Sequence, residues 1–505
     1  DHLALHDSDG DTVATTDVND LGGALFRNID PGTGYIVENV DTGLTSAPVT
    51  VHSDAAAPWD PSIYDQTINP GGYQYLTTRD GTQLAVNVHL PLAGGPGPYP
   101  TLIEYAGYGY ADPDGPQSGL ATLANAMGFA VVDVNMRGTG CSGGAFDYFE
   151  TLQNLDAYDV IETVANQPWV LHHQVGMFGI SYGGISQLFA AQLNPPSLAA
   201  IAPLSVIDAT PTTLYPGGIL NTGFALSWAQ GRVDDAKPAT ADTGQKWAYE
   251  RIQDGDTVCA DNQVLHASAV DLIAKIHAND HYDPAVADPL DPVSFVHKIH
   301  VPVYLACQFQ DEQTGGHCPE LVRHFTGTDD KWFSFTNGAH IDALDPENLN
   351  QIFDFLELFV AERPPGPDNG LLRLAAPIIY RTALGVGDDV SYTLPHDPVQ
   401  DETTFAGALA AFRNLPTVQV RFDNGAGSDP TGNHIAGNPY AAYTTGFDSL
   451  PAPGTQTRTW YLGPDGSLTD TPPTGYAADT YTSDATALPK TDYGDHTGGG
   501  GLWAN

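Results

Sequence analysis

Basic residues are scarce in this chain of 505 residues. Lysine and arginine together number 18, against 61 aspartate and glutamate residues, which gives a formal net charge of -43. A surface with this charge repels nucleic acid and anionic membranes, so we expect neither as a partner. The acidity itself favours solubility, as in a secreted protein or one from a salty habitat. It does not identify a substrate.

Long apolar runs and metal-binding motifs are also missing. No stretch of about 18 apolar residues occurs, so we do not expect the sequence to span a membrane. No two cysteines have CxxC spacing and no HExxH occurs, so we predict neither a metal site nor a cofactor. The cluster Asp7-Ser8-Asp9-Gly10-Asp11 lacks the later Glu of an EF-hand loop, and an Asp/Gly turn explains it better than calcium binding.

The four cysteines are Cys141, Cys259, Cys307 and Cys318, and they allow three pairings. Cys307 and Cys318 bracket a short Gly-containing loop, which favours that bridge and leaves Cys141 with Cys259. The alternative is four buried thiols in a cytosolic enzyme. Because disulfides persist in oxidising compartments, we favour an extracellular or secreted protein. The sequence starts with Asp and shows no signal peptide, so we expect that a targeting signal has been removed.

The length suggests two to four domains, and 41% hydrophobic residues supply material for a core. Residues 1–57 contain short strands between Gly and Asp turns, typical of a small β-sandwich-like unit. Residues 72–206 and 297–363 alternate strands with helices, which indicates a largely parallel sheet. Between them, residues 207–296 are rich in helix formers and aromatics, which predicts a helical cap. Residues 364–505 are rich in turn-forming residues, and we expect a β-rich region there.

A G-x-S-x-G motif occurs at Gly179-Ile180-Ser181-Tyr182-Gly183. An apolar strand over 174–180 leads into it, and a helix over 185–193 leads out. This is the setting of a nucleophile elbow, in which a strained turn exposes the serine hydroxyl above the sheet. We therefore predict an α/β fold with an α/β-hydrolase core and Ser181 as its nucleophile. The alternative is an incidental Gly-rich turn, since the chain has 54 glycines.

A serine hydroxyl needs a general base, and the base needs an acid that orients it. In this fold both follow the serine, each in a loop after a later strand. The strand over 301–308 leads to Asp311 and Glu312, and the strand over 332–336 leads to His340. We predict His340 as the base and Asp311 as the acid, with Glu312 as its rival. The backbone N–H of Tyr182 is the first expected donor to the oxyanion.

These motifs resemble those of the CocE/NonD hydrolases, the family of cocaine-esterase-like and X-prolyl dipeptidyl-peptidase-like enzymes. The resemblance runs from Thr77-Thr78-Arg79-Asp80-Gly81 through Met136-Arg137-Gly138-Thr139-Gly140 and the elbow to the helix near residue 360. It implies a helical cap, a C-terminal jelly roll and a tyrosine hydroxyl in the oxyanion hole. Tyr108 falls at the position of that tyrosine, with Gly107 where relatives often have proline. Tyr105 is the alternative.

Two departures from the family pattern affect the expected function. The sequence ends before a jelly roll would be complete, so we expect 364–505 to be an incomplete one, truncated or processed. Relatives that bind α-amino substrates carry extra carboxylates beside the catalytic Asp and Ser, whereas here Gln313 and Thr314 follow Glu312. We therefore predict a serine hydrolase that cleaves small-molecule carboxylic esters or amides. The alternatives are an X-prolyl dipeptidyl peptidase or α-amino-acid ester hydrolase, and a non-catalytic surface protein on a hydrolase scaffold.

Overall fold

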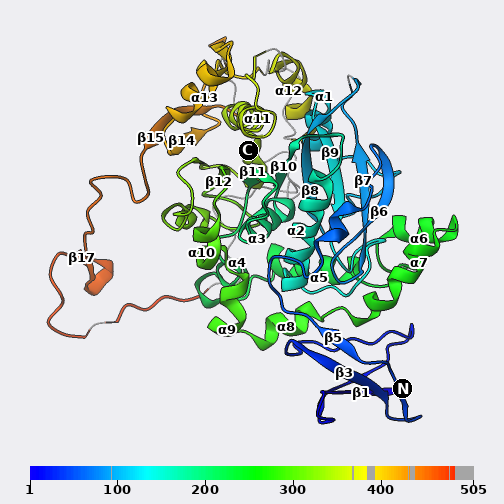
Figure 1. The fold of residues 1–505 in the computed structure, drawn as a ribbon. Coiled ribbons are helices and arrows are strands. Elements are labelled where there is room, and N and C mark those ends of the chain that lie inside the picture. Colours follow the sequence, from blue (N-terminus) through cyan, green and yellow to red (C-terminus); the bar gives the residue numbers. More distant parts are fainter. Residues whose placement is uncertain are drawn as a thin grey trace.

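The computed structural model describes residues 1–92, 94–366, 369–383, 393–429, 431–432, 438–476 and 478–483. A ten-stranded sheet forms the centre of the molecule. The N-terminal residues form a separate five-stranded sheet, which lies at one end of the molecule (Figure 1). Within these ranges, none of the helices combines the length and the apolar character that a membrane crossing requires.

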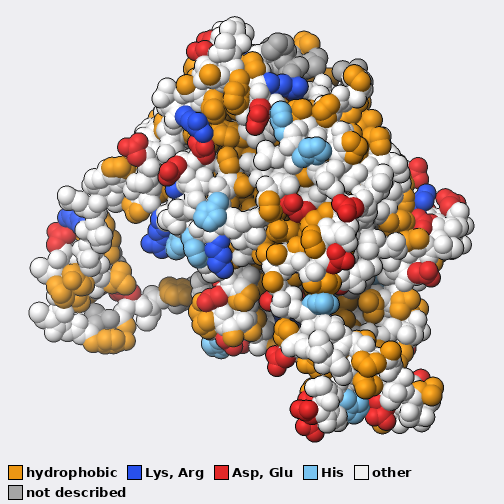
Figure 2. Space-filling view, in the orientation of Figure 1, with side chains coloured by type: hydrophobic (Ala, Val, Ile, Leu, Met, Phe, Trp, Pro, Cys, Tyr) orange, Lys and Arg blue, Asp and Glu red, His pale blue; other side chains and the backbone are white. Residues whose placement is uncertain are grey.

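The N-terminal unit is an antiparallel sheet in the order β2-β1-β3-β4, with β5 paired to β3. Its strands are β1 (His2–His6), β2 (Thr12–Asp17), β3 (Gly32–Asn39), β4 (Leu44–Thr45) and β5 (Val49–Val51). Asn19 donates to a carbonyl of the cap at 2.9 Å, and Arg27 forms an ion pair with Glu150. These contacts attach the unit to the rest of the chain. Hydrophobic side chains are visible on its surface (Figure 2), and Leu44 and Val49 are among those exposed.

The central sheet has the order β15-β14-β13-β12-β11-β10-β8-β9-β7-β6. The strands from β8 to β14 are parallel to one another, whereas β6 and β7 form an antiparallel hairpin beside β9 and β15 is antiparallel to β14. Its strands are β6 (Gly72–Thr77), β7 (Gln83–His89), β8 (Tyr99–Ala106), β9 (Ala130–Asn135), β10 (Val170–Ile180), β11 (Leu198–Leu204), β12 (Val303–Gln308), β13 (Lys331–Thr336), β14 (Val418–Asn424) and β15 (Ala441–Phe447). The apolar runs of the sequence correspond to these strands because a parallel sheet is covered on both faces.

Helices cover both faces of the central sheet (Figure 1). One face carries α1 (Gly119–Ala126), α11 (Pro346–Phe359), α12 (Asn369–Ala383) and α13 (Phe405–Arg413), and the other carries α2 (Thr151–Ala165) and α3 (Tyr182–Ala191). Side chains alternate along a strand, so each strand serves two cores. In β8, Leu102 packs in the core under α1 and α11, and the next residue, Ile103, packs in the core under α2 and α3.

The segment between β11 and β12 is a helical cap, as the sequence predicts. Its helices are α4 (Thr210–Leu214), α5 (Phe224–Asp235), α6 (Lys246–Gln253), α7 (Thr257–Asn262), α8 (Leu272–Ala278), α9 (Pro284–Ala287) and α10 (Pro292–Phe295). A disulfide between Cys141 and Cys259 links α7 to the loop after β9, and a second one joins Cys307 to Cys318. Both bridges are the pairings that the sequence favours.

The C-terminal region differs from its prediction. The described residues after 363 form no jelly roll, and the core does not end at 363 as expected. Instead α12 and α13 cover the central sheet, and β14 and β15 extend it beyond β13. Among the described residues after 363, only β16 (Tyr461–Leu462) and β17 (Leu468–Thr469) form a sheet apart from the central one. β14 pairs with β13, so β13 is not left as an unpaired edge strand, and Val418 of β14 is buried. Both effects favour this arrangement. The prediction for residues 484–505 lies outside the described residues.

Candidate active site

Ser181 forms the turn between β10 and α3. Its backbone has φ 61° and ψ -126°, a strained conformation for a residue with a side chain. The Ser181 N–H donates to the Leu204 carbonyl at 2.9 Å, and the Ile185 N–H donates to the Ser181 carbonyl at 2.7 Å. Position 184 requires glycine, because a Cβ at Gly184 would lie 2.5 Å from the Leu204 oxygen. The strand–turn–helix context expected for an elbow is therefore present.

Asp311 and His340 lie together where the neighbouring strands β12 and β13 end. His340 Nδ1 is 2.8 Å from Asp311 Oδ2 and 3.0 Å from Oδ1, and both side chains are buried. Because a carboxylate only accepts hydrogen bonds, Nδ1 carries the proton in this contact. Asp311 Oδ1 also accepts the backbone N–H groups of Gln313 and Thr314, both at 2.8 Å. The carboxylate is therefore fixed by the loop that carries it.

Glu312, the rival acid, makes a different contact with the same histidine. Its Oε2 accepts the backbone N–H of His340 at 2.9 Å. On the other side, Ser205 Oγ donates to the His340 carbonyl at 2.7 Å. Glu312 and Ser205 thus hold the main chain of His340, while Asp311 orients its ring. In the described part of the chain the buried Nε2 of His340 has no hydrogen-bond partner, so it is the ring atom available to accept a proton.

Three tyrosines near the elbow differ in how their hydroxyls are used. Burial holds the pKa of Tyr182 well above its usual range, so this phenol stays neutral. Tyr105 donates its hydroxyl to the Gln153 carbonyl at 2.7 Å and is therefore engaged by α2. The hydroxyl oxygen of Tyr108 accepts the Trp228 indole N–H at 2.9 Å, and its ring packs edge-on against Tyr182. Of the two tyrosines considered for the oxyanion hole, Tyr108 is the one whose proton is not committed within the described ranges.

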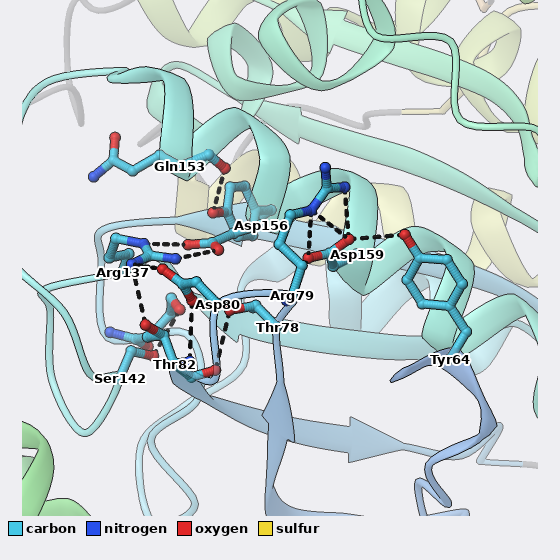
Figure 3. A network of polar contacts seen from close by, with 12 residues as sticks. Tyr64, Thr78, Arg79, Asp80, Thr82, Arg137, Ser142, Gln153, Asp156 and Asp159 are labelled. Carbon is cyan, nitrogen blue, oxygen red and sulfur yellow. Dashed lines mark hydrogen bonds and ion pairs between the residues drawn. The ribbon is translucent and has the colours of Figure 1, made fainter. Parts of the chain in front are cut away.

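A buried network of ion pairs holds two of the sequence motifs against α2 (Figure 3). Arg137 donates to Asp156 from Nε and Nη2 at 2.8 and 2.7 Å, and its Nη1 donates to Asp80 at 2.7 Å. Arg79 makes a matching contact with Asp159, one turn further along α2. Burial raises the pKa of Asp156 to about 6, against the opposing effect of Arg137. The network fixes the β6–β7 turn and the loop after β9.

An apolar pocket of about 300 Å³ extends from Ser181 between the core and the cap. Its lining includes Tyr148, Ile207, Tyr215, Phe224, Trp228 and Ile276. This size and composition suit a small organic ligand.

Charged side chains at this pocket are either paired or exposed to solvent. Lys275 forms an ion pair with Asp147 at 2.8 Å. Asp280 pairs with the neighbouring His281, and Asp283 caps α9. Among the described residues, these two exposed aspartates are the carboxylates that line the pocket. The lining therefore offers no buried carboxylate to a substrate ammonium group.

The sequence does not indicate which residues of the cap contact Tyr108; it shows only that the cap segment is rich in aromatic residues. Trp228 and Gln245 contact the Tyr108 loop from 120 and 138 residues away along the chain. Ser205, which holds the His340 carbonyl, is 135 residues away from it. Contacts of this separation follow from the tertiary fold, and no local pattern indicates them.

Known proteins are similar to this chain in sequence and in fold. Cocaine esterase of Rhodococcus sp. (strain MB1 Bresler) is 34% identical over 155 residues, which cover 30% of this chain and 26% of that protein. The chain thus matches about a quarter of that relative's length. A crystal structure of a CocE/NonD family hydrolase from Staphylococcus aureus has a TM-score of 0.53 at 18% identity, over 79% of this chain and 60% of that one. This likeness shows the α/β-hydrolase fold.

A family model described as X-Pro dipeptidyl-peptidase (S15 family) matches residues 80–342. The matched segment contains the elbow, the cap, Asp311 and His340. Since it spans just over half of the 505 residues, the chain belongs to the X-Pro dipeptidyl-peptidase (S15) family, and with it to the CocE/NonD-type hydrolases that its motifs resemble.

Proposed function

We propose that the protein is a serine hydrolase that cleaves uncharged carboxylic esters through an acyl-enzyme on Ser181. The observation that carries this proposal is the buried pair of His340 and Asp311, with Nε2 of His340 unpartnered within the described residues. A buried imidazole whose other nitrogen is held by a carboxylate is suited to act as a general base.

In the proposed reaction, Ser181 is the nucleophile and His340 is the general base. His340 Nε2 takes the proton of the Ser181 hydroxyl as its oxygen attacks the ester carbonyl carbon. The negative charge that develops on the carbonyl oxygen is stabilised by the backbone N–H of Tyr182 and the hydroxyl of Tyr108. The imidazolium returns its proton to the departing alcohol, which leaves an acyl-serine. A water molecule, deprotonated by the same imidazole, then releases the acid and restores the serine.

The pocket favours esters without an α-amino group. Its walls are apolar, and the carboxylates that line it, Asp280 and Asp283, are exposed and have local partners. Exposed carboxylates contribute little to binding an ammonium group, because water screens them. Glu312 accepts a backbone N–H of His340, so it is already engaged. These observations favour an esterase over an aminoacyl hydrolase.

The description of the family model favours a second candidate, an X-Pro dipeptidyl peptidase. One substrate panel separates the two: p-nitrophenyl acetate, butyrate and benzoate, the p-nitrophenyl ester of alanine, and alanyl-proline p-nitroanilide. We expect the highest kcat/KM on the butyrate or the benzoate, and no turnover by Ser181→Ala. A higher kcat/KM on alanyl-proline p-nitroanilide would contradict the esterase proposal and support the peptidase.

A further inference from the structure

Three residues of the cap converge on Tyr108, which lies in the loop after β8 in the core. Trp228 and Arg232 come from α5, and Gln245 immediately precedes α6. They contact three different parts of the Tyr108 segment: the hydroxyl, the ring and the preceding carbonyl.

The contact from Trp228 sets the direction of the Tyr108 hydroxyl. The indole Nε1 lies 2.9 Å from the hydroxyl oxygen. An indole N–H can only donate, so the tyrosine oxygen accepts and its own proton must point elsewhere. Within the described part of the chain no acceptor takes that proton. Trp228 and Tyr182 both line the pocket that contains Ser181, and the Tyr108 ring packs edge-on against that of Tyr182, so Tyr108 lies directly behind this part of the pocket wall.

Arg232 lies over the face of the same tyrosine. Its guanidinium carbon is 4.5 Å from the centre of the Tyr108 ring and 5.3 Å from that of Trp228. It also forms an ion pair with Asp235 on the next turn of α5. A cation over the face of a phenol ring is attracted to it and so helps to hold the ring in place.

Gln245 fixes the backbone just before Tyr108. Its Nε2 donates to the Gly107 carbonyl at 2.8 Å. Its Oε1 accepts from Asn135 at 3.0 Å and from Trp247 at 2.8 Å, so both ends of the buried amide are held. The carbonyl of Gly107 therefore cannot rotate freely, and neither can the peptide that leads into Tyr108.

We propose that the cap completes the oxyanion hole, with Trp228, Arg232 and Gln245 as positioning residues that hold the Tyr108 hydroxyl ready to donate. The inference rests on the proposed function, because it assigns Tyr108 to the oxyanion. A donor fixed before the reaction costs no reorganisation when the charge develops, which is why its orientation matters for the rate. The cap thereby contributes to the chemical step as well as to the shape of the pocket.

A double-mutant cycle tests the proposal with the full chain and a p-nitrophenyl ester. Tyr108→Phe is expected to lower kcat about 100-fold, as for the loss of one oxyanion donor. Trp228→Phe keeps an aromatic ring and loses the N–H, and should lower kcat about fivefold. In the Tyr108→Phe background, Trp228→Phe should have no further effect on kcat, because no hydroxyl remains to be oriented.

An aryl trifluoromethyl ketone, which forms a tetrahedral alkoxide on serine, gives a second readout. Its inhibition constant should rise in the same variants and by the same pattern as kcat falls.

Trp169→Phe is the matched control. Its buried indole donates to the Ile68 carbonyl at 2.9 Å, as Trp228 does to Tyr108, but at a position outside the site. It should lose a similar amount of stability and keep the kcat of the wild type. Arg232→Lys should retain more kcat than Arg232→Met, since it keeps the positive charge over the Tyr108 ring.

The outcomes separate the two proposals. Equal effects of Trp228→Phe with and without the Tyr108 hydroxyl would overturn the positioning role and leave the esterase intact. An unchanged kcat in Tyr108→Phe would also overturn it. Failure of the proposed function itself would appear as ester turnover that survives in Ser181→Ala.

Discussion

Asp311 contacts the ring of His340, whereas the adjacent Glu312 contacts only its backbone. The distances are 2.8 Å from Asp311 Oδ2 to Nδ1 and 2.9 Å from Glu312 Oε2 to the main-chain nitrogen. Two neighbouring carboxylates thus hold one histidine in different ways, and only the first contact sets the tautomer of the imidazole. This difference leads to a test with two nearly isosteric variants.

Asp311→Asn should lower kcat about 10⁴-fold, because an amide can donate to Nδ1 and favour the wrong tautomer. Glu312→Gln is the matched change, and its amide oxygen can still accept the His340 N–H. We expect it to lower kcat less than about tenfold. Steady-state kinetics on one ester, with circular dichroism to confirm folding, measures both. A larger loss in Glu312→Gln than in Asp311→Asn would reverse the assignment of the acid.

A buried pair of carboxylates should make stability depend on pH. Glu104 and Asp133 are register partners on β8 and β9, and both are buried. Burial, with the neighbouring carboxylate, raises the pKa of Glu104 well above its usual range, and burial raises the pKa of Asp133 to about 7. Above a pH of about 4, the two carboxyl groups therefore keep their protons in the folded state, whereas in the unfolded state they have lost them. The contribution of this pair to the free energy of unfolding should therefore fall as the pH rises above about 4, and the part due to Asp133 should level off above about 7.

Glu104→Gln isolates this contribution, because the variant keeps an acceptor for the Ser118 hydroxyl, 2.9 Å away. The variant has no carboxyl group at position 104 to keep a proton in the folded state, so this part of the pH dependence is removed. We expect the variant to lose about 1 kcal/mol less stability than the wild type between pH 5 and pH 7. Urea unfolding at several pH values gives both profiles. Parallel curves for the two proteins would contradict the coupling.

The two disulfides should differ in their effect on stability. The bridge from Cys141 to Cys259 closes a loop of 118 residues, and that from Cys307 to Cys318 closes one of 11. Loop-closure entropy then predicts a loss of about 5 kcal/mol for the first double Ser variant and about 3 kcal/mol for the second. Because the first bridge also ties the cap to the core, its removal should increase hydrogen exchange in α7. Exchange confined to the β12 loop in that variant would contradict this role.

The pocket predicts which esters are turned over best. Ile276 on α8 lines it, and Ile276→Phe would fill part of its volume. We expect kcat/KM for a benzoate or hexanoate ester to fall about tenfold, while that for the acetate changes less than twofold. Ile273→Phe, on the same helix outside the pocket lining, is the control. If acetate and benzoate lose activity equally, the pocket does not hold the large part of the substrate.

Local patterns in the sequence predict the parts of this fold that depend on neighbouring residues. The strand before Ser181 and the helix after it are indicated by their apolar spacing, and the loops with Asp311 and His340 by the strands that precede them. The β14 strand could not be assigned to the sheet in this way, because α12 and α13 separate it from β13, its partner. The contact between Trp228 and Tyr108 could not be predicted from local patterns either, since the two residues are 120 positions apart in the chain.

Labelling with a fluorophosphonate tests the central claim most directly. The probe reacts with a serine whose hydroxyl is activated by a neighbouring base, and peptide mass spectrometry locates the adduct. We predict a single adduct on Ser181, absent from Ser181→Ala and strongly slowed in a His340→Ala variant that folds normally. No adduct on the folded wild-type protein, or an adduct on another serine, would contradict the assignment of Ser181 as the nucleophile.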